Sequence, residues 1–83
     1  MKCVFSNQFD FFVARSLEEC VDLAKKYYLE IGYDQPCEED LNFEPCYPIT
    51  KLFGIKMDDI TVYKSYKDWA EESDIGFLAS SEY

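Results

Sequence analysis

The sequence predicts a small α+β domain in which a mostly antiparallel sheet is covered by one long helix, with a short second helix near the C-terminus. The chain contains two pairs of β-favouring segments. A short polar break separates the two segments of each pair, and a helical pattern follows each pair. Hairpins beside single helices are typical of this class. With 83 residues, the chain has the length of one domain, residues 1–83. Its 48% hydrophobic and 18% aromatic content is too apolar for a disordered chain.

The first predicted hairpin lies at the N-terminus. Residues 2–5 and 9–14 are rich in aromatic and β-branched side chains, which favour strands. The polar residues 6–8 between them form a break of hairpin length, and Asn7 tolerates the left-handed backbone conformation that such turns use. We therefore expect two antiparallel strands joined near Asn7.

A long helix is predicted at residues 17–31. Ser16 is a good N-cap, and Glu19 three residues later completes a capping box. Gly32 follows at the position where a glycine commonly ends a helix. Apolar side chains recur at helical spacing and form one stripe, which contains Leu17, Cys20, Val21, Ala24, Tyr28 and Ile31.

Residues 33–50 are the irregular part of the chain. Three prolines, which are unfavourable in helix interiors and central strands, lie within these 18 residues. A single helical turn is expected at Glu38–Leu41. Long ordered loops are more often functional than not. Three apolar side chains should hold the segment against the domain: Leu41, Phe43 and Tyr47.

A second hairpin is predicted from Leu52–Met57 and residues 60–63. In the first of these segments, every second residue from Phe53 onward is apolar, which places one apolar face on a strand. Asp58 and Asp59 separate the two segments as a tight turn, although Asp-Asp is a weaker turn signal than Asp-Gly.

The last predicted elements are a short helix at residues 66–73 and a strand at residues 75–79. Ser65 is a suitable N-cap, and the carboxylate of Asp68 favours the positive end of the helix dipole. Residues 80–83 are expected to fray, as chain ends commonly do.

Charge is unevenly distributed along the chain. The formal net charge is −9, from 17 acidic and 8 basic residues, so repulsion by phosphate backbones argues against direct nucleic-acid binding. Eleven of the acids lie in two segments, residues 28–50 and 68–83, that contain no Lys or Arg. Unpaired carboxylates repel one another and cost folding stability, so their segregation favours a partner with a basic surface. The alternative is that they only keep an aromatic-rich domain soluble.

We therefore predict an interface formed by the acidic segments and the aromatic residues among them. Tyrosine and tryptophan offer a large rigid contact area with a polar tip, and both are enriched at protein interfaces. The predicted partner-binding residues are Asp34, Glu38, Glu39, Asp40, Glu44, Tyr47, Asp68, Trp69, Glu71, Glu72 and Asp74.

The cysteines show no metal-binding or catalytic pattern. Cys3, Cys20, Cys37 and Cys46 include no CxxC pair, and the chain contains no histidine. Because we expect a compartment in which thiols stay reduced, free cysteines acting as small buried hydrophobes are favoured. Disulfides are the less favoured alternative, and a zinc site built from four thiolates at irregular spacing is the least favoured.

Motifs for catalysis and for cofactor binding are absent from the sequence. The acidic run at residues 34–40 does not match a calcium loop, because its third and sixth positions are Pro36 and Glu39. No phosphate-binding glycine loop, GxSxG or HExxH motif occurs. Without histidine, a cysteine nucleophile would have no imidazole to activate it. We therefore expect a non-enzyme with no cofactor and no metal site.

The leading hypothesis is a small acidic inhibitor that binds a basic nucleic-acid-binding protein or nuclease, with carboxylates in place of phosphates. In size, acidity and lack of catalytic residues, the chain is similar to phage anti-defence inhibitors such as anti-CRISPR and anti-restriction proteins, and this similarity is one of composition only. An immunity protein or antitoxin that neutralises a basic toxin is the second hypothesis. A structural or regulatory interaction domain is the third.

The sequence also carries an expectation about location. No secretory signal pattern begins the chain, and no run approaches the ~18–20 apolar residues of a membrane span. We expect a cytoplasmic protein, in the host cytoplasm if the chain is phage-encoded, with no membrane partner. We expect it to act as a monomer or a small homo-oligomer.

Overall fold

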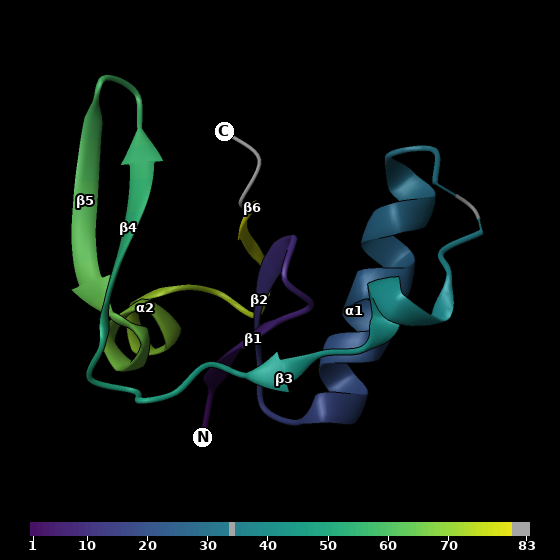
Figure 1. Cartoon of the computed structure of the whole chain (residues 1–83), viewed down its shortest axis with the longest axis horizontal. Coiled ribbons are helices and arrows are strands. Elements are labelled where there is room, and N and C mark those ends of the chain that lie inside the picture. The colour runs from purple at the N-terminus through teal and green to yellow at the C-terminus, as the bar shows by residue number, and fades with distance from the viewer. Residues whose placement is uncertain (34, 81–83) are drawn as a thin grey trace.

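The computed structural model describes residues 1–33 and 35–80, and these residues form two antiparallel sheets, two α-helices and one 3-10 helix (Figure 1). The first sheet has the strand order β3-β1-β2-β6, with β1 at Cys3–Ser6, β2 at Asp10–Ala14, β3 at Glu44–Pro45 and β6 at Gly76–Ser80. The second sheet pairs β4, Leu52–Met57, with β5, Ile60–Ser65. The helices are α1 at Leu17–Glu30, the 3-10 helix η1 at Glu38–Leu41 and α2 at Tyr66–Glu72. The predicted fold class is confirmed.

The first sheet is covered on both faces. Val4 pairs with Val13 in neighbouring strands, and both side chains pack in the core cluster that contains residues of α2 and of the β4–β5 hairpin. The adjacent pair, Phe5 and Phe12, points to the other face and packs against α1. Figure 1 shows α1 and η1 on one side of this sheet and α2 with the hairpin on the other. This layering places η1 and α2 on opposite sides of the first sheet.

The turn of the first hairpin differs from the prediction. The positive φ angle falls on Gln8, at 84°, and not on Asn7. Asn7 is 4% exposed, and its side-chain Oδ1 accepts hydrogen bonds from the backbone N–H groups of Phe9, at 3.0 Å, and Asp10, at 2.8 Å. The turn is therefore held by an asparagine side chain that bonds to its own backbone two and three residues later.

The predicted start of the long helix is confirmed, with one change in its capping. Ser16 Oγ accepts a hydrogen bond of 3.2 Å from the N–H of Glu19. The carboxylate of Glu19 reaches past Ser16 and accepts from the N–H of Arg15 at 2.7 Å. The Arg15 guanidinium also binds this carboxylate at 2.7 Å. The reciprocal half of the capping box is therefore displaced by one residue.

The end of α1 is also where the prediction placed it. Gly32 has a φ of 92°, and its N–H donates to the carbonyl of Leu29 at 3.2 Å. The N–H of Tyr33 donates to the carbonyl of Tyr28 at 2.7 Å, which completes a Schellman motif. The predicted apolar stripe is longer than the buried one, because Leu17 and Ile31 at its ends are exposed.

The irregular segment contains a strand that was not predicted. Glu44–Pro45 pairs with β1 as β3, and its proline is tolerated because β3 is an edge strand of two residues. The predicted turn at Glu38–Leu41 is confirmed as η1. Phe43 is buried as expected, whereas Tyr47 is 69% exposed and does not hold the segment in place.

The C-terminal elements follow the prediction closely. Asp58 adopts a φ of 54° in the turn of the second hairpin, and the N-cap hydroxyl of Ser65 accepts from the N–H of Asp68 at 3.2 Å. The hairpin forms a sheet of its own and is attached to α2 by the Trp69 indole, whose Nε1 donates to the carbonyl of Phe53 at 2.7 Å. Strand β6 begins one residue after the predicted strand and ends at Ser80, so the fraying predicted for residues 80–83 is wrong at Ser80. Residues 81–83 lie outside the described residues.

Candidate functional site: an acidic surface and the pocket beside it

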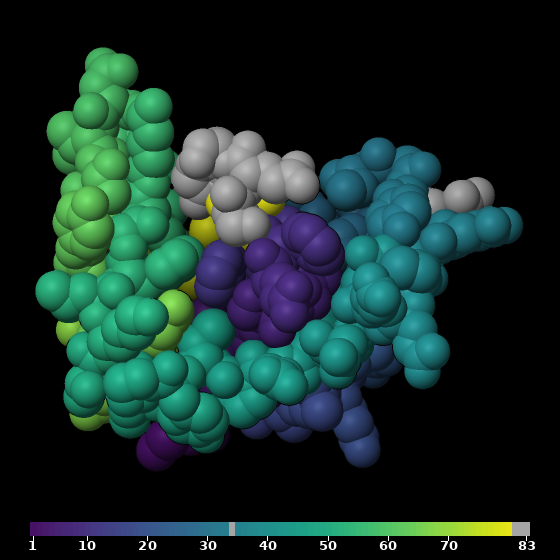
Figure 2. Space-filling view, in the orientation of Figure 1, coloured from purple at the N-terminus to yellow at the C-terminus, as the bar shows by residue number. Residues whose placement is uncertain are grey.

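The predicted interface residues lie on two separate surfaces. We call Glu38, Glu39, Asp40 and Glu44 the η1 surface, and Asp68, Glu71, Glu72 and Asp74 the α2 surface. Helix η1 contacts α1 on one face of the first sheet, and α2 contacts β1 and β5 on the other. Figure 2 shows the chain from η1 through β3 crossing one face of the molecule toward the hairpin. Asp34 lies outside the described residues.

The α2 surface is partly neutralised by lysines. Lys64 Nζ lies 3.2 Å from a carboxylate oxygen of Glu72, and the same ammonium lies 4.7 Å from the centre of the Trp69 ring. Lys2 Nζ donates to the carbonyl oxygens of Glu71, at 3.4 Å, and Ser73, at 2.7 Å, at the C-terminal end of α2. The negative field of this surface is therefore reduced by cations that come from β5 and the N-terminus.

The η1 surface keeps its negative charge. Among residues 1–33 and 35–80, the ion pairs are Arg15 with Glu19 and Lys64 with Glu72, and neither touches η1. Glu38, Glu39 and Glu44 are all exposed. The last turn of α1, which lies beside η1, carries no basic residue, so the negative end of the helix dipole adds to the same field.

Trp69 is removed from the predicted interface by its burial. Its side chain is 2% exposed and belongs to the core between the first sheet and the hairpin. A partner that leaves the fold intact therefore has almost no access to this ring. Trp69 follows the acidic Asp68 in sequence but faces inward on the helix, and this burial argues against its place among the predicted interface residues. Tyr47, in contrast, is exposed and remains available.

Asp40 is held in one orientation by its neighbours. One carboxylate oxygen accepts hydrogen bonds from the Tyr33 hydroxyl, from the Cys37 N–H at 3.0 Å and from the Cys37 thiol at 3.1 Å. The bond from Tyr33, followed by those from Cys37, lowers the pKa of Asp40 below its ordinary value. The same bond raises the pKa of Tyr33. Asp40 therefore remains ionised and joins η1 to the end of α1.

A second, buried network continues from Asp40 to the first hairpin. Asn7 Nδ2 donates to the carbonyl of Asp40 at 2.6 Å and to the Tyr28 hydroxyl oxygen at 2.9 Å. The Tyr28 hydroxyl donates in turn to Oδ2 of Asp10 at 2.8 Å. Burial, and after it the bond to Asp10, raises the pKa of Tyr28 well above its ordinary value.

Asp10 and Tyr28 are not among the predicted site residues, although the sequence contains a signal for each. Asp10 is an acid within an otherwise apolar strand, so it requires a polar partner if it is even partly buried. Tyr28 lies in the buried stripe of α1, and a buried tyrosine hydroxyl usually finds a hydrogen-bond partner.

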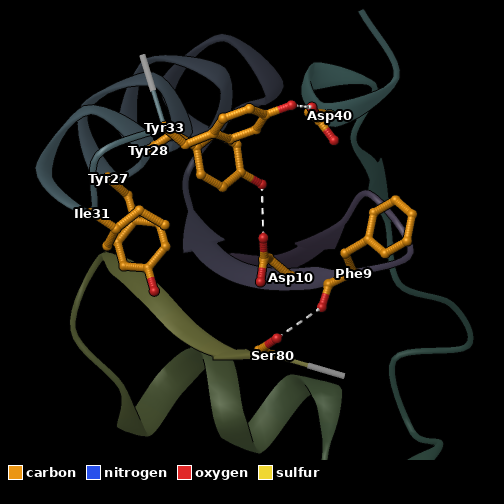
Figure 3. A pocket seen from close by; sticks show the side chains of 8 residues that line it. All are labelled: Phe9, Asp10, Tyr27, Tyr28, Ile31, Tyr33, Asp40 and Ser80. Carbon is orange, nitrogen blue, oxygen red and sulfur yellow. Dashed lines mark hydrogen bonds between the residues drawn. The ribbon is translucent and has the colours of Figure 1, made fainter. Parts of the chain in front are cut away.

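These networks form the wall of an open pocket of about 460 Å³ (Figure 3). It lies between the C-terminal end of α1, the start of β2 and η1. Figure 3 shows the hydroxyls of Tyr28 and Tyr33 directed at Asp10 and Asp40, with the Phe9 ring from the hairpin on another side of the pocket. The pocket is lined by four aromatic residues and two carboxylates: Phe9, Tyr27, Tyr28, Tyr33, Asp10 and Asp40.

The thiols of Cys20 and Cys46 are poorly suited to covalent chemistry. All four are free, and burial raises the pKa of Cys20 to about 12 and that of Cys46 to about 11. The expectation of small buried hydrophobes is met by Cys20, whereas Cys37 is exposed. Among the residues that the structure describes, no group of three or more Cys, Asp or Glu side chains is arranged to hold a metal ion.

None of the described helices combines the length and the apolar character needed to cross a membrane.

No family model, curated protein or solved structure matches this chain. Its surface charge and its pocket therefore provide the observations that bear on function.

Proposed function

We propose that this chain is a non-catalytic binding protein that uses the η1 surface to bind a basic surface on another protein. The observation that carries the proposal is the set of exposed, unpaired carboxylates on η1 and β3, beside the unneutralised end of α1. Exposed carboxylates in this arrangement steer a basic partner toward the surface and form charge-assisted hydrogen bonds with its Arg and Lys side chains.

The class of partner follows from the same charge. A nucleic-acid-binding protein or nuclease presents a basic groove that normally receives phosphates, and the carboxylates of η1 would occupy it in their place. With a net charge of −9, the chain would compete with nucleic acid for this groove and would not bind nucleic acid itself. Inhibition of the anti-defence type is the function that this competition would serve.

The proposal favours the η1 surface over the α2 surface for an electrostatic reason. On α2, Lys64 already pairs with Glu72, and Lys2 covers the carbonyl end of the helix. A basic partner would have to displace or repel these lysines. No basic residue is described in contact with the carboxylates of η1, so their field acts on a partner undiminished.

Two charge-reversal variants test the proposal. The first is Glu38→Lys with Glu39→Lys on η1, and the matched control is Glu71→Lys with Asp74→Lys on the α2 surface. Each variant changes the net charge from −9 to −5, so non-specific electrostatic effects are equal. All four side chains are exposed, and none forms an ion pair or a side-chain hydrogen bond within the described residues.

The variants and the wild-type chain are immobilised, and a lysate of the source organism is passed over each. We expect the wild type and the control to retain a basic nucleic-acid-binding protein. Raising the salt from about 0.1 M to about 1 M should elute it, because the Debye length falls from about 10 Å to about 3 Å. The η1 variant should retain at most about one tenth of it. Equal retention by the η1 variant, or retention of no basic protein by the wild type, would contradict the proposal.

A further inference from the structure

The geometry of the pocket beside η1 points to a receptor site for one guanidinium group, supplied by an arginine of the basic partner. The assignment of this arginine to a protein rests on the proposed function, whereas the preference for a guanidinium rests on the pocket alone. Four features of the pocket support this preference: its carboxylates, its aromatic rings, its place at the end of α1 and its lack of a metal-binding arrangement.

Each of the two carboxylates of the pocket accepts hydrogen bonds from the chain through only one of its oxygens. In Asp10, Oδ2 accepts from the Tyr28 hydroxyl, and in Asp40, Oδ2 accepts from Tyr33 and Cys37. The Oδ1 atom of each accepts no hydrogen bond from residues 1–33 and 35–80. One oxygen therefore fixes each carboxylate in place, and the other is left for a donor that enters the pocket.

Within residues 1–33 and 35–80, no cationic side chain pairs with these carboxylates. Neither Asp10 nor Asp40 belongs to an ion pair in the described part of the chain. The pocket also lies at the C-terminal end of α1, where the helix dipole is negative and the last turn contains no basic residue. A cation is favoured by all of these fields, and an anion is opposed by all of them.

The aromatic lining selects the kind of cation. The rings of Tyr28 and Tyr33 meet edge to face, with centroids 5.6 Å apart, and Phe9 lies across the pocket from them. Tyr28 is buried, whereas Phe9 and Tyr33 are 45% and 42% exposed. Exposed ring faces attract organic cations, and a planar guanidinium stacks on them while its N–H groups donate to carboxylates. A bare metal ion would instead need several ligands close together, and the described residues contain no such group.

The preference for a guanidinium is tested without any partner. N-acetylarginine N-methylamide is titrated into the full ¹⁵N-labelled chain to tens of millimolar, and backbone amide shifts are followed by NMR. The citrulline analogue, which has the same shape and no charge, is the matched control probe. We expect saturable shifts at Phe9, Asp10, Tyr33 and Asp40 with the arginine probe only. Equal shifts with both probes, or shifts confined to other residues, would overturn the inference.

Asp10→Asn tests the role of the carboxylate. It keeps an oxygen that can accept from Tyr28 and removes the charge, so the arginine probe should bind at least about tenfold more weakly. Asp22→Asn, an exposed position elsewhere on α1, makes the same change in net charge and should leave binding unaltered. If Asp10→Asn fails to fold, the comparison of arginine with citrulline on the wild-type chain still decides the inference.

The same variant separates the pocket from the proposed function. With Asp10→Asn as the immobilised chain, the basic partner should elute at lower salt than from Asp22→Asn. Elution at equal salt would overturn the assignment of the guanidinium to the partner. Capture of the partner by the wild type together with no response to the arginine probe would overturn the pocket and leave the proposed function standing.

Discussion

The Tyr28 hydroxyl donates a hydrogen bond of 2.8 Å to Oδ2 of Asp10, and this bond joins the end of α1 to the start of β2. The same hydroxyl accepts from Nδ2 of Asn7 at 2.9 Å. Tyr28 and Asn7 are each 4% exposed, so these polar atoms depend on one another and not on solvent. Residues that line the candidate pocket therefore also stabilise the fold.

Tyr28→Phe should lower the free energy of unfolding by about 1–3 kcal/mol, because it deprives Asp10 of a donor and Asn7 of an acceptor in a buried place. The control is Tyr63→Phe, since Tyr63 is 66% exposed, and its effect should stay within about 0.5 kcal/mol. Urea denaturation measures both. Equal midpoints for the two variants would show that the network contributes nothing to stability.

Asp40→Asn should make stability less dependent on acid pH. The folded-state pKa of Asp40 is lowered by Tyr33 and Cys37, so its stabilising contribution is present above the unfolded pKa of about 3.9. That contribution is lost as the pH falls through the lower, folded-state pKa. Urea midpoints of wild type and variant should differ at pH 7 and converge at acid pH. Asp74→Asn is the exposed control, and a pH-independent difference for Asp40→Asn would contradict the assignment.

Alkylation should distinguish the cysteines by their burial. At pH 8, iodoacetamide should label the exposed Cys37 first, because pKa values of about 12 and about 11 leave only about 10⁻⁴ of Cys20 and about 10⁻³ of Cys46 as thiolate. Peptide mass spectrometry gives the order of labelling.

Adding reductant should leave the melting temperature of the protein unchanged, and a large decrease would reveal a disulfide.

Trp69→Phe should destabilise the domain by about 1–3 kcal/mol, because it leaves the carbonyl of Phe53 without its donor and opens space in the core that joins α2 to the hairpin. Below its unfolding transition, the variant should bind the basic partner as the wild type does. A loss of affinity in the folded variant, judged by circular dichroism, would return Trp69 to the interface.

Several parts of the fold were predictable because short-range interactions decide them. Ser16 and Ser65 each bond to an N–H three residues later, and Gly32 supplies the positive φ that ends α1. Each of these features needs only the residues of one turn, so the printed sequence contains all of its causes. The register of the second hairpin is similarly local, since two residues join β4 and β5.

The role of Asn7 could not be predicted in the same way. Its turn position suggested the left-handed conformation for Asn7, yet Gln8 adopts that conformation. Asn7 instead bonds to Tyr28 and Asp40, which lie 21 and 33 residues away. Only the packing of α1 and η1 against the first hairpin brings these partners together. The pairing of Glu44–Pro45 with β1 has the same kind of cause.

The sequence by itself determined the α+β class, the helix ends and the segregation of acids along the chain, because propensity, capping and composition act locally. The tertiary structure decided which acids lie together. Since the first sheet is covered on both faces, η1 and α2 fall on opposite sides, and Lys64 from β5 and Lys2 from the N-terminus partly neutralise only the α2 surface. Packing also turned Trp69 inward and brought Asp10 and Asp40 into one pocket. These outcomes depend on contacts between segments that are remote in sequence, and the spacing of residues along the chain does not reveal such contacts.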